Sequence, residues 1–371
     1  MTTDQEVITE QRSEAPLRLG LLGGGLNSAV GYTHYLASRL DGHFEVAAGC
    51  FSRDPEINAA TAARMGVPPD RCYPSKEKLL ADERHGIDAV CVLTPTPDHA
   101  ETVVAALGAG FDVICEKALA TSVAEAGSIE AALAASDQQL FVTFNYAGYP
   151  MVREARALIE SGKIGQVQQI YCEMPQESFS RVQAQPQDWR KRDYDIPCVS
   201  LDLGVHVHQL VEFLAGFENL VPRSTSTGSF GRVPHVIDTV AVLAEGDRGT
   251  LISLMWGKAA LGHTNGLRFR VFGETGSIEW HQEQPELITL CDAHGAKNVI
   301  ERGQPDLKVA NQPRYNRFKA GHPAGFVEAF ANIYADFADG LLLRDNAELP
   351  YFKAATAVKG LRFLHDAHSL E

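Results

Sequence analysis

Two short stretches of the sequence carry the residue types that acid–base and electrostatic catalysis require. Lys117 follows an apolar run directly after Glu116. A lysine at the end of a buried strand needs a partner or a function, because a desolvated ammonium group is costly. Asp202 and His206 lie four residues apart and would share one face of a helix. Since a neighbouring carboxylate raises the basicity of an imidazole, we interpret Lys117, Asp202 and His206 as candidate catalytic residues.

A cationic segment precedes this helix. It carries Arg181, Arg190, Lys191 and Arg192, with Trp189 among them, in a chain whose formal net charge is −14. The planar guanidinium group suits carboxylate, phosphate and sulfonate oxygens. If one or two of these side chains enter the pocket, the segment predicts an anionic substrate. If none does, it forms a solvated basic face.

The stretch 17–40 predicts the element that would hold a cofactor. An apolar run leads to Gly23-Gly24-Gly25, and a helical pattern follows. A strand, a turn without side chains and a helix N-terminus suit a dinucleotide pyrophosphate. The pattern G-x-G-x-x-G is met only in part, since Ser28 takes the place of the third glycine. The helix is predicted by apolar side chains at three- and four-residue spacing: Ala29, Tyr32, Tyr35, Leu36 and Leu40.

Further apolar runs alternate with helical patterns and predict a doubly wound parallel sheet, an α/β Rossmann fold. These runs are 44–51, 87–93, 112–115 and 140–144. Ligands of such sheets bind at the carboxyl ends of the strands. The predicted cofactor-binding residues therefore lie at these ends: Gly23, Gly25, Leu26, Asn27, Ser28, Ser52, Arg53, Thr94, Pro95, Thr96, His99, Glu116, Lys117 and Asn145.

The end of the second predicted strand bears on the choice between NAD and NADP. Ser52 stands where NAD-binding folds commonly place an acid on the adenosine ribose, and Arg53 follows it. This pair leaves room for a 2′-phosphate, or the guanidinium group stacks on adenine. Both cofactors stay open.

Beyond residue 150 the pattern changes to an α+β domain with a largely antiparallel, open sheet. Its predicted strands are 167–174, 239–244, 250–256, 268–272, 277–280 and 287–290. The open face would suit a subunit interface and thus a homodimer or homotetramer. The predicted units are a flexible tail (1–16), the dinucleotide-binding domain (17–149), the substrate-binding and oligomerisation domain (150–350) and a C-terminal helix on the first domain (351–371).

Composition excludes several classes of protein. A net charge of −14 argues against nucleic acid or an anionic membrane as a partner, because both need a basic surface. The sequence has no run of about 18 apolar residues and no signal peptide, so we expect a cytoplasmic protein with a small-molecule substrate. The seven cysteines form no C-x-x-C pair, and His208 lies around the helix from His206, so we predict no metal site.

In combination these motifs resemble the Gfo/Idh/MocA oxidoreductases, the glucose–fructose oxidoreductase and inositol dehydrogenase family. The resemblance covers residues 17–371 and includes motifs of a sugar-acting branch at 273–280 and 321–326. The family motifs appear as Glu116-Lys117-Ala118, without the usual proline, as Asp202, Gly204 and His206, and as Asn145 with Pro150.

The resemblance implies hydride transfer between nicotinamide C4 and a ring carbon, with C3 expected, of a sugar or glycoside. It implies that His206 accepts the hydroxyl proton, that Lys117 stabilises the alkoxide, and that Asp202 orients the substrate or His206. The substrate-binding candidates are Tyr146, Tyr149, Arg181, Trp189, Arg190, Arg192, His263 and His322.

An NAD-dependent glycosidase on the same fold stays open as an alternative. Such an enzyme oxidises the sugar transiently, eliminates the aglycone, adds water and reduces the product. Sulfoquinovosides are substrates of this kind of enzyme, and the cationic segment would suit their sulfonate. The additional acid or base would come from Tyr146, Tyr149, Asp193 or Tyr194. A third possibility, a non-catalytic regulator, is opposed by the intact catalytic candidates.

Overall fold

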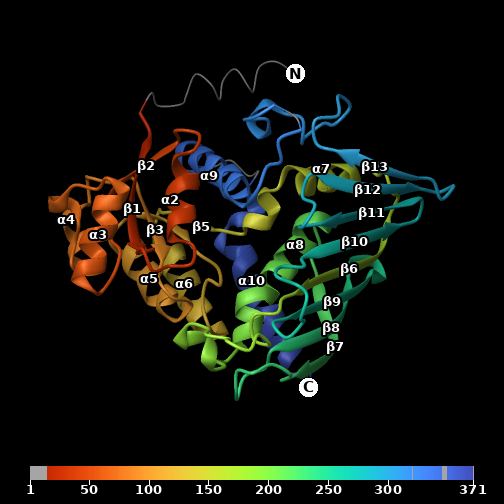
Figure 1. The fold of residues 1–371 in the computed structure, drawn as a ribbon, viewed down its shortest axis with the longest axis horizontal. Coiled ribbons are helices and arrows are strands. Elements are labelled where there is room, and N and C mark those ends of the chain that lie inside the picture. The colour runs from red at the N-terminus through yellow and green to blue at the C-terminus, as the bar shows by residue number, and fades with distance from the viewer. Residues whose placement is uncertain (1–14, 320, 345–348, 371) are drawn as a thin grey trace.

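The computed structural model describes residues 15–319, 321–344 and 349–370, and the predicted tail 1–16 lies almost wholly outside them. Two sheets face each other across helices from the end of the chain (Figure 1). No helix in these ranges combines the length and the apolar character that crossing a membrane requires.

The first sheet is parallel throughout, as the sequence predicts, with the strand order β2-β1-β3-β4-β5. Both of its faces are covered, which explains why its strands are nearly continuous apolar runs. The strands are β1 (Leu17–Gly23), β2 (Phe44–Cys50), β3 (Ala89–Leu93), β4 (Asp112–Cys115) and β5 (Leu140–Val142). The helices between them are α2 (Gly31–Arg39), α3 (Pro55–Met65), α4 (Lys76–Asp82), α5 (His99–Gly108) and α6 (Val123–Ala134).

Helix α2 buries a different face from the one that predicts it. Tyr32, Leu36 and Leu40 are each about two-fifths exposed, at 42%, 38% and 43%. The buried face instead carries His34 and small side chains. His34 is buried because its ring packs edge-on against Phe330 and forms a hydrogen bond with the Tyr334 hydroxyl. Phe330 and Tyr334 both belong to a helix near the end of the chain.

The second sheet has eight strands in the order β13-β12-β11-β10-β6-β9-β8-β7. Its pairs are antiparallel except for the parallel pair β6–β9. The strands are β6 (Val167–Pro175), β7 (Leu220–Gly228), β8 (Thr239–Gly246), β9 (Leu251–Gly257), β10 (Arg268–Gly273), β11 (Gly276–His281), β12 (Leu287–Asp292) and β13 (Lys297–Glu301).

The two strands that the sequence does not predict, β7 and β13, are the two edges of this sheet. Edge strands tolerate polar residues and proline, because one side of the backbone faces away from the ladder. Accordingly β7 is rich in serine and threonine and carries Pro222 beside a register shift, and β13 exposes Lys297 and Glu301. Their sequences therefore lack the alternation that reveals the central strands.

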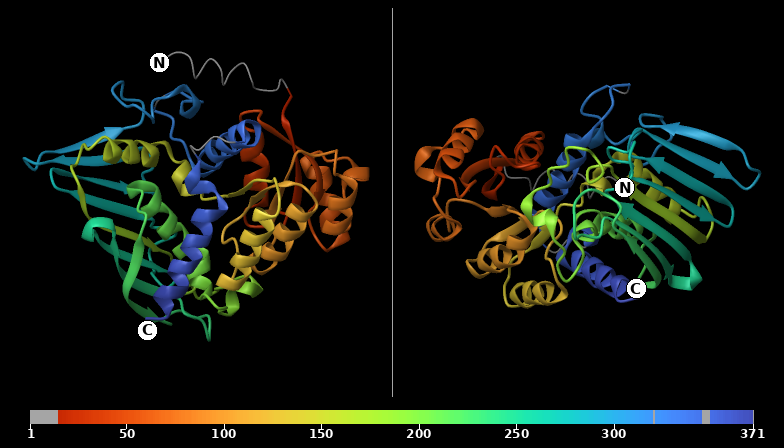
Figure 2. Two further views of the ribbon diagram at one scale, coloured as in Figure 1. Left: turned by 180° about the vertical axis from the view of Figure 1, so that it is seen from behind. Right: turned by 60° about the horizontal axis from the view of Figure 1, so that its bottom comes forward.

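One face of the second sheet is covered by helices and the other is open. Helix α7 (Pro150–Glu160) contacts β11 and β12, and α8 (Val205–Ala215) contacts β6 and β9. Helix α10 (Ala354–His368) packs between α6 of the first unit and β7 and α8 of the second. Figure 2 shows these helices on the side of the sheet that faces the first unit.

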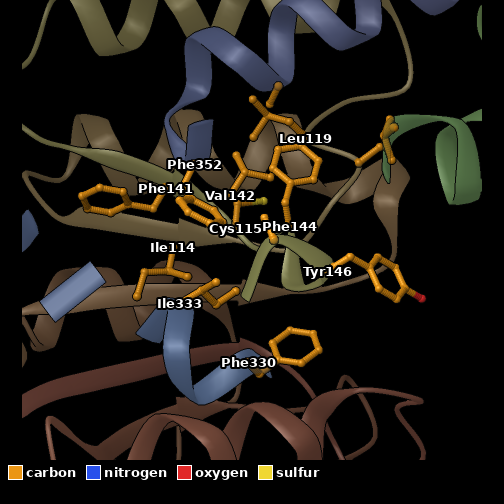
Figure 3. Close-up of a cluster of buried hydrophobic side chains, with 14 of the residues drawn as sticks. Ile114, Cys115, Leu119, Phe141, Val142, Phe144, Tyr146, Phe330, Ile333 and Phe352 are labelled. Atoms are coloured by element: carbon orange, nitrogen blue, oxygen red, sulfur yellow. The ribbon is translucent and has the colours of Figure 1, made fainter. Parts of the chain in front are cut away.

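Helix α9 (Phe326–Leu343) returns from the second unit to the first and packs against α2. Figure 3 shows Phe330 and Ile333 of α9 in one cluster with Ile114 of β4 and Phe141 of β5. Phe337 of the same helix stacks on Phe141 with ring centroids 5.1 Å apart. The core of the parallel sheet therefore includes residues from the last fifth of the chain.

This shared core yields a stability prediction. We expect Phe337→Ala to lower the free energy of unfolding by about 3–5 kcal/mol, because it leaves a cavity against Phe141. Urea titration followed by circular dichroism measures this loss. Leu342→Ala, on the same helix but 38% exposed, is the matched control. Equal losses in the two variants would contradict the placement of α9 in this core.

Candidate active site

A cleft with a cavity volume of about 690 Å³ opens at the carboxyl ends of β1 to β4. Gln187, Trp189 and Arg190 of the second unit complete its wall. Leu26 and Asn145 are not among the described residues that line it. The other predicted cofactor-binding residues do line it: Gly23, Gly25, Asn27, Ser28, Ser52, Arg53, Thr94, Pro95, Thr96, His99, Glu116 and Lys117.

The glycine turn after β1 has the shape that a dinucleotide requires. Gly23 has a φ of 87°, and a Cβ there would lie 2.7 Å from the backbone of Leu93. Gly31 approaches so closely that a Cβ would lie 2.1 Å from the carbonyl oxygen of Gly24. Gly31, rather than the position held by Ser28, thus permits the close packing of helix on turn that the third glycine of the motif provides. These residues fit a dinucleotide with its pyrophosphate at the N-terminus of α2.

At the end of β2 the first acidic residue turns away from the cleft. Asp54 caps α3, and its Oδ1 accepts hydrogen bonds from the N–H groups of Glu56 and Ile57 at 2.9 and 3.3 Å. Ser52 accepts a hydrogen bond from the Asp54 N–H through its hydroxyl oxygen. The wall of the cleft at the predicted ribose site therefore carries Ser52 and Arg53 without a carboxylate from the strand end.

The Asp202 carboxylate joins three cationic side chains from three parts of the chain. Lys117 Nζ donates to Asp202 Oδ1 at 2.9 Å, and Arg190 Nε donates to Oδ2 at 2.8 Å. Lys258 Nζ lies 2.6 Å from Oδ2. Burial alone would raise the pKa of Asp202, but the charges of Lys117, Lys258 and Arg190 hold that pKa well below its usual range. The carboxylate is therefore ionised and fixes the position of Lys117.

Asp202 does not serve His206 in the way that their spacing predicts. Asp202 lies in a π-helical turn, Ser200–Gly204, that precedes α8, and its carboxylate bonds the three cations instead of the imidazole. A π turn is wider than an α turn, so residues four apart no longer stack. The turn packs tightly, since a Cβ on Gly204 would lie 2.9 Å from the Trp256 ring.

His206 lies in an apolar surround next to Lys117. The rings of Phe144 and Tyr146 meet the imidazole edge-on, with centroids 6.3 and 4.7 Å away. Burial and the positive charge of Lys117 lower the pKa of His206 to about 3. Its Nδ1 has no hydrogen-bond partner among the described residues. The imidazole is therefore neutral near pH 7 and can accept a proton.

The residue before Lys117 is anchored separately. Glu116 accepts hydrogen bonds from His34 Nε2 at 3.0 Å and from the Thr143 hydroxyl at 2.5 Å. Burial opposes both charges, yet hydrogen bonds to Cys91 and Glu116 raise the pKa of His34 to about 9, and His34 lowers the pKa of Glu116 to about 2. This ion pair ties α2 to the strand end that presents Lys117. The peptide bond between Lys117 and Ala118 is cis.

The substrate-side candidates divide into two groups. Trp189 and Arg190 line the cleft, and the guanidinium carbon of Arg190 lies 4.2 Å from the centroid of the Trp189 ring. Tyr146 is beside His206 and accepts a hydrogen bond from Asn265 at 2.8 Å. Tyr149 stacks on Tyr146, which in turn contacts His206. His263 lies on the loop that carries Asn265.

The remaining candidates lie on the surface. Arg181 pairs with Glu177, and Arg192 stacks over Tyr194 with its side chain in solvent. His322 is exposed beside the Lys319 carbonyl group. Lys191 pairs with the exposed Asp188. Of the predicted cationic segment, only Arg190 turns inward, so most of that segment is a solvated face.

Sequence reasoning missed Lys258, although a signal for it exists. Lys258 directly follows β9, much as Lys117 lies two residues after the end of β4, and its side chain is only 8% exposed. A lysine at the end of a buried strand was the feature that singled out Lys117. His34 gave no such signal, because its partners Glu116 and Tyr334 are distant in the sequence.

Comparisons with known proteins agree with this geometry. A family model described as an oxidoreductase family with an NAD-binding Rossmann fold matches residues 17–144, and the GFO/IDH/MocA C-terminal domain matches residues 152–279. The chain is 30% identical to the uncharacterized oxidoreductase YfiI of Bacillus subtilis, over 95% of this chain and 93% of that protein.

Two further relatives are named for a substrate or were solved with one. The chain is 28% identical to levoglucosan dehydrogenase of Pseudarthrobacter phenanthrenivorans, over 75% of this chain and 76% of that protein. It is 31% identical to an inositol dehydrogenase homolog from Azotobacter vinelandii, whose structure was solved with NADH and myo-inositol. The alignment covers 96% of each chain with a TM-score of 0.86. The protein therefore belongs to the Gfo/Idh/MocA family of NAD-dependent oxidoreductases, which includes dehydrogenases of sugars and polyols.

Proposed function

We propose that this protein oxidises a ring hydroxyl of a sugar or glycoside, with C3 as the expected carbon and NAD as the hydride acceptor. The observation that carries the proposal is a neutral, buried His206 near Lys117, which lines the cofactor cleft and is held there by Asp202. The myo-inositol and levoglucosan of its relatives support a cyclic polyol or sugar as the substrate class.

In this reaction the substrate loses a proton from oxygen and a hydride from carbon, and a carbonyl group forms. Bound NAD supplies the hydride acceptor. His206 takes the hydroxyl proton, because its imidazole is held neutral by its apolar surround. Lys117 donates a hydrogen bond to the same oxygen and stabilises the developing alkoxide. Asp202 acts through Lys117, whose ammonium group it orients.

A panel of substrates tests the proposal. Neutral and anionic sugars, and the corresponding aryl glycosides, are incubated with NAD or with NADP while NADH absorbance and aglycone release are followed together. We expect reduced cofactor to accumulate in step with substrate loss. Aglycone release without net reduction, and with solvent deuterium at C2, would instead establish the redox glycosidase, for which Tyr146 beside His206 is the available extra acid. If no sugar or glycoside in the panel gave either reduced cofactor or released aglycone, the proposal would be contradicted.

The role of Lys117 gives a second test. Lys117→Met should lower kcat by about 10²–10³-fold, because it removes the group that stabilises the alkoxide, while NAD binding measured by calorimetry is retained. Lys163→Met removes an exposed lysine and serves as the control. A kcat within a few-fold of the wild type would exclude Lys117 from the chemistry.

We also propose that the open face of the second sheet joins two copies of the chain. Its strands present Leu243, Leu251 and Met255 outward, with exposed fractions of 58%, 65% and 36%. Tyr171 lies beside them on β6. An apolar face of this kind on a sheet needs a cover, and a second identical face provides one with twofold symmetry.

Light scattering during gel filtration tests this interface. We expect a dimer or tetramer for the wild type and a shift toward monomer for Leu251→Glu, because the new charge would be buried in the contact. Val182→Glu, at a side chain 84% exposed outside the sheet, is the control. A wild-type monomer, or an unchanged assembly in Leu251→Glu, would contradict this interface.

A further inference from the structure

The group around Asp202 carries more positive charge than its own carboxylate balances. Lys117, Arg190 and Lys258 all contact this one acid, so two positive charges are left over within the described residues. The side chains are largely withdrawn from water, with exposed fractions of 15%, 22% and 8%. Surplus charge in such a place is costly unless an anion joins it.

A second buried acid, Glu116, does not supply that balance. Glu116 is also buried near Lys117, but its charge is matched by its own ion pair with His34. Burial lowers the pKa of Lys258, and so do the neighbouring positive charges of Arg190 and Lys117. Asp202 raises this pKa but does not offset them. The cluster therefore has a local need for negative charge, although the whole chain carries a net charge of −14.

The cluster also retains hydrogen-bond donors. Arg190 uses Nε and Nη2 on Asp202 and Nη1 on Gln187, so two of its five N–H groups have no partner in the described residues. Lys258 donates to Asp202 and to Gln176 Oε1, the latter at 3.4 Å, and its Nζ lies 5.4 Å from the centroid of the Phe179 ring; its third N–H has no hydrogen-bond acceptor among the described residues. A planar or tetrahedral oxyanion accepts hydrogen bonds from just such a pair of groups.

Arg190 is held in place for this role. Its guanidinium group lies over the Trp189 ring and is bracketed by Asp202 and Gln187, and Trp189 Nε1 itself donates to Gln187 at 3.0 Å. The next residue, Lys191, extends into solvent instead. An arginine that is fixed before binding loses little side-chain entropy when a ligand arrives.

The phosphates of the cofactor do not account for this site. The glycine turn that fits the pyrophosphate follows β1, whereas Lys117 follows β4, on the other side of β3. One cation next to the reacting oxygen suffices for the alkoxide, and Lys117 supplies it. Lys258 approaches Asp202 through its other oxygen, Oδ2, and Arg190 spans both oxygens, with Nε on Oδ2 and Nη2 on Oδ1.

We propose that Arg190 and Lys258 form a subsite for an anionic group of the substrate, a carboxylate, sulfonate or phosphate carried by the sugar. That the substrate is a sugar rests on the proposed function. That it carries an anionic group rests on the surplus positive charge and the free hydrogen-bond donors of the cluster. It makes Lys258 a specificity-determining residue.

Substrate selectivity tests the subsite. A neutral hexose is compared with its 6-carboxylate, 6-sulfonate and 6-phosphate by kcat/KM, using NADH absorbance. We expect Lys258→Met to lower the ratio of anionic to neutral kcat/KM by about tenfold or more, chiefly through KM, because a charge-assisted hydrogen bond is lost. Lys258→Arg should restore most of the ratio. Lys191→Met, which removes an exposed neighbouring cation, should leave it unchanged.

A binding measurement separates the subsite from the catalytic proposal. Sodium sulfate is added to the NAD-bound protein, and the melting temperature is compared with that in sodium chloride of equal ionic strength. We expect sulfate to raise the melting temperature of the wild type and of Lys191→Met, and to have a smaller effect on Lys258→Met and Arg190→Gln. Sulfate binding without oxidation of any sugar would overturn the proposed reaction only. The subsite would be overturned if the enzyme oxidised sugars but the Lys258 and Arg190 variants kept the wild-type ratio of anionic to neutral kcat/KM and the wild-type rise in melting temperature with sulfate.

Discussion

The active site depends on one buried carboxylate. Asp202 is held in a π-helical turn, and three cationic side chains contact it: Lys117 after β4, Arg190 in the turn 188–191 and Lys258 after β9. Taking ions out of water is costly, and an ion pair repays that cost only with well-made contacts. Without Asp202 the three cations would repel one another where little water reaches them, so this carboxylate holds together the chain segments that follow β4 and β9.

The two groups that would perform the chemistry differ in the partners that surround them. Burial removes charge from His206, which has no acid as a hydrogen-bonding partner, and so leaves a neutral base. Lys117 is nearly as enclosed but keeps an ionised partner. The site therefore combines a neutral base with a lysine fixed by a buried carboxylate, and enzymes assign different roles to neighbouring groups through such differences in environment.

Local patterns in the sequence were enough to predict the parallel sheet and the central strands of the second sheet, and all the predicted cofactor-binding residues except Leu26 and Asn145 line the cleft. Local patterns failed where long-range contacts decide. The buried face of α2 is chosen by Phe330 and Tyr334, about 300 residues away. The edge strands β7 and β13 lack alternation, and the π turn changes which side chains Asp202 meets. Lys258 followed a rule already applied to Lys117 and could have been found.

The return of α9 to the first sheet has a consequence for the newly made chain. A ribosome releases the N-terminal strands first, and isolated domains often fold as soon as they emerge. Here the apolar surface around Phe141 and Ile114 stays uncovered until Phe330, Ile333 and Phe337 have been synthesised. The core of the first domain is therefore complete only after the residues of α9 have been synthesised.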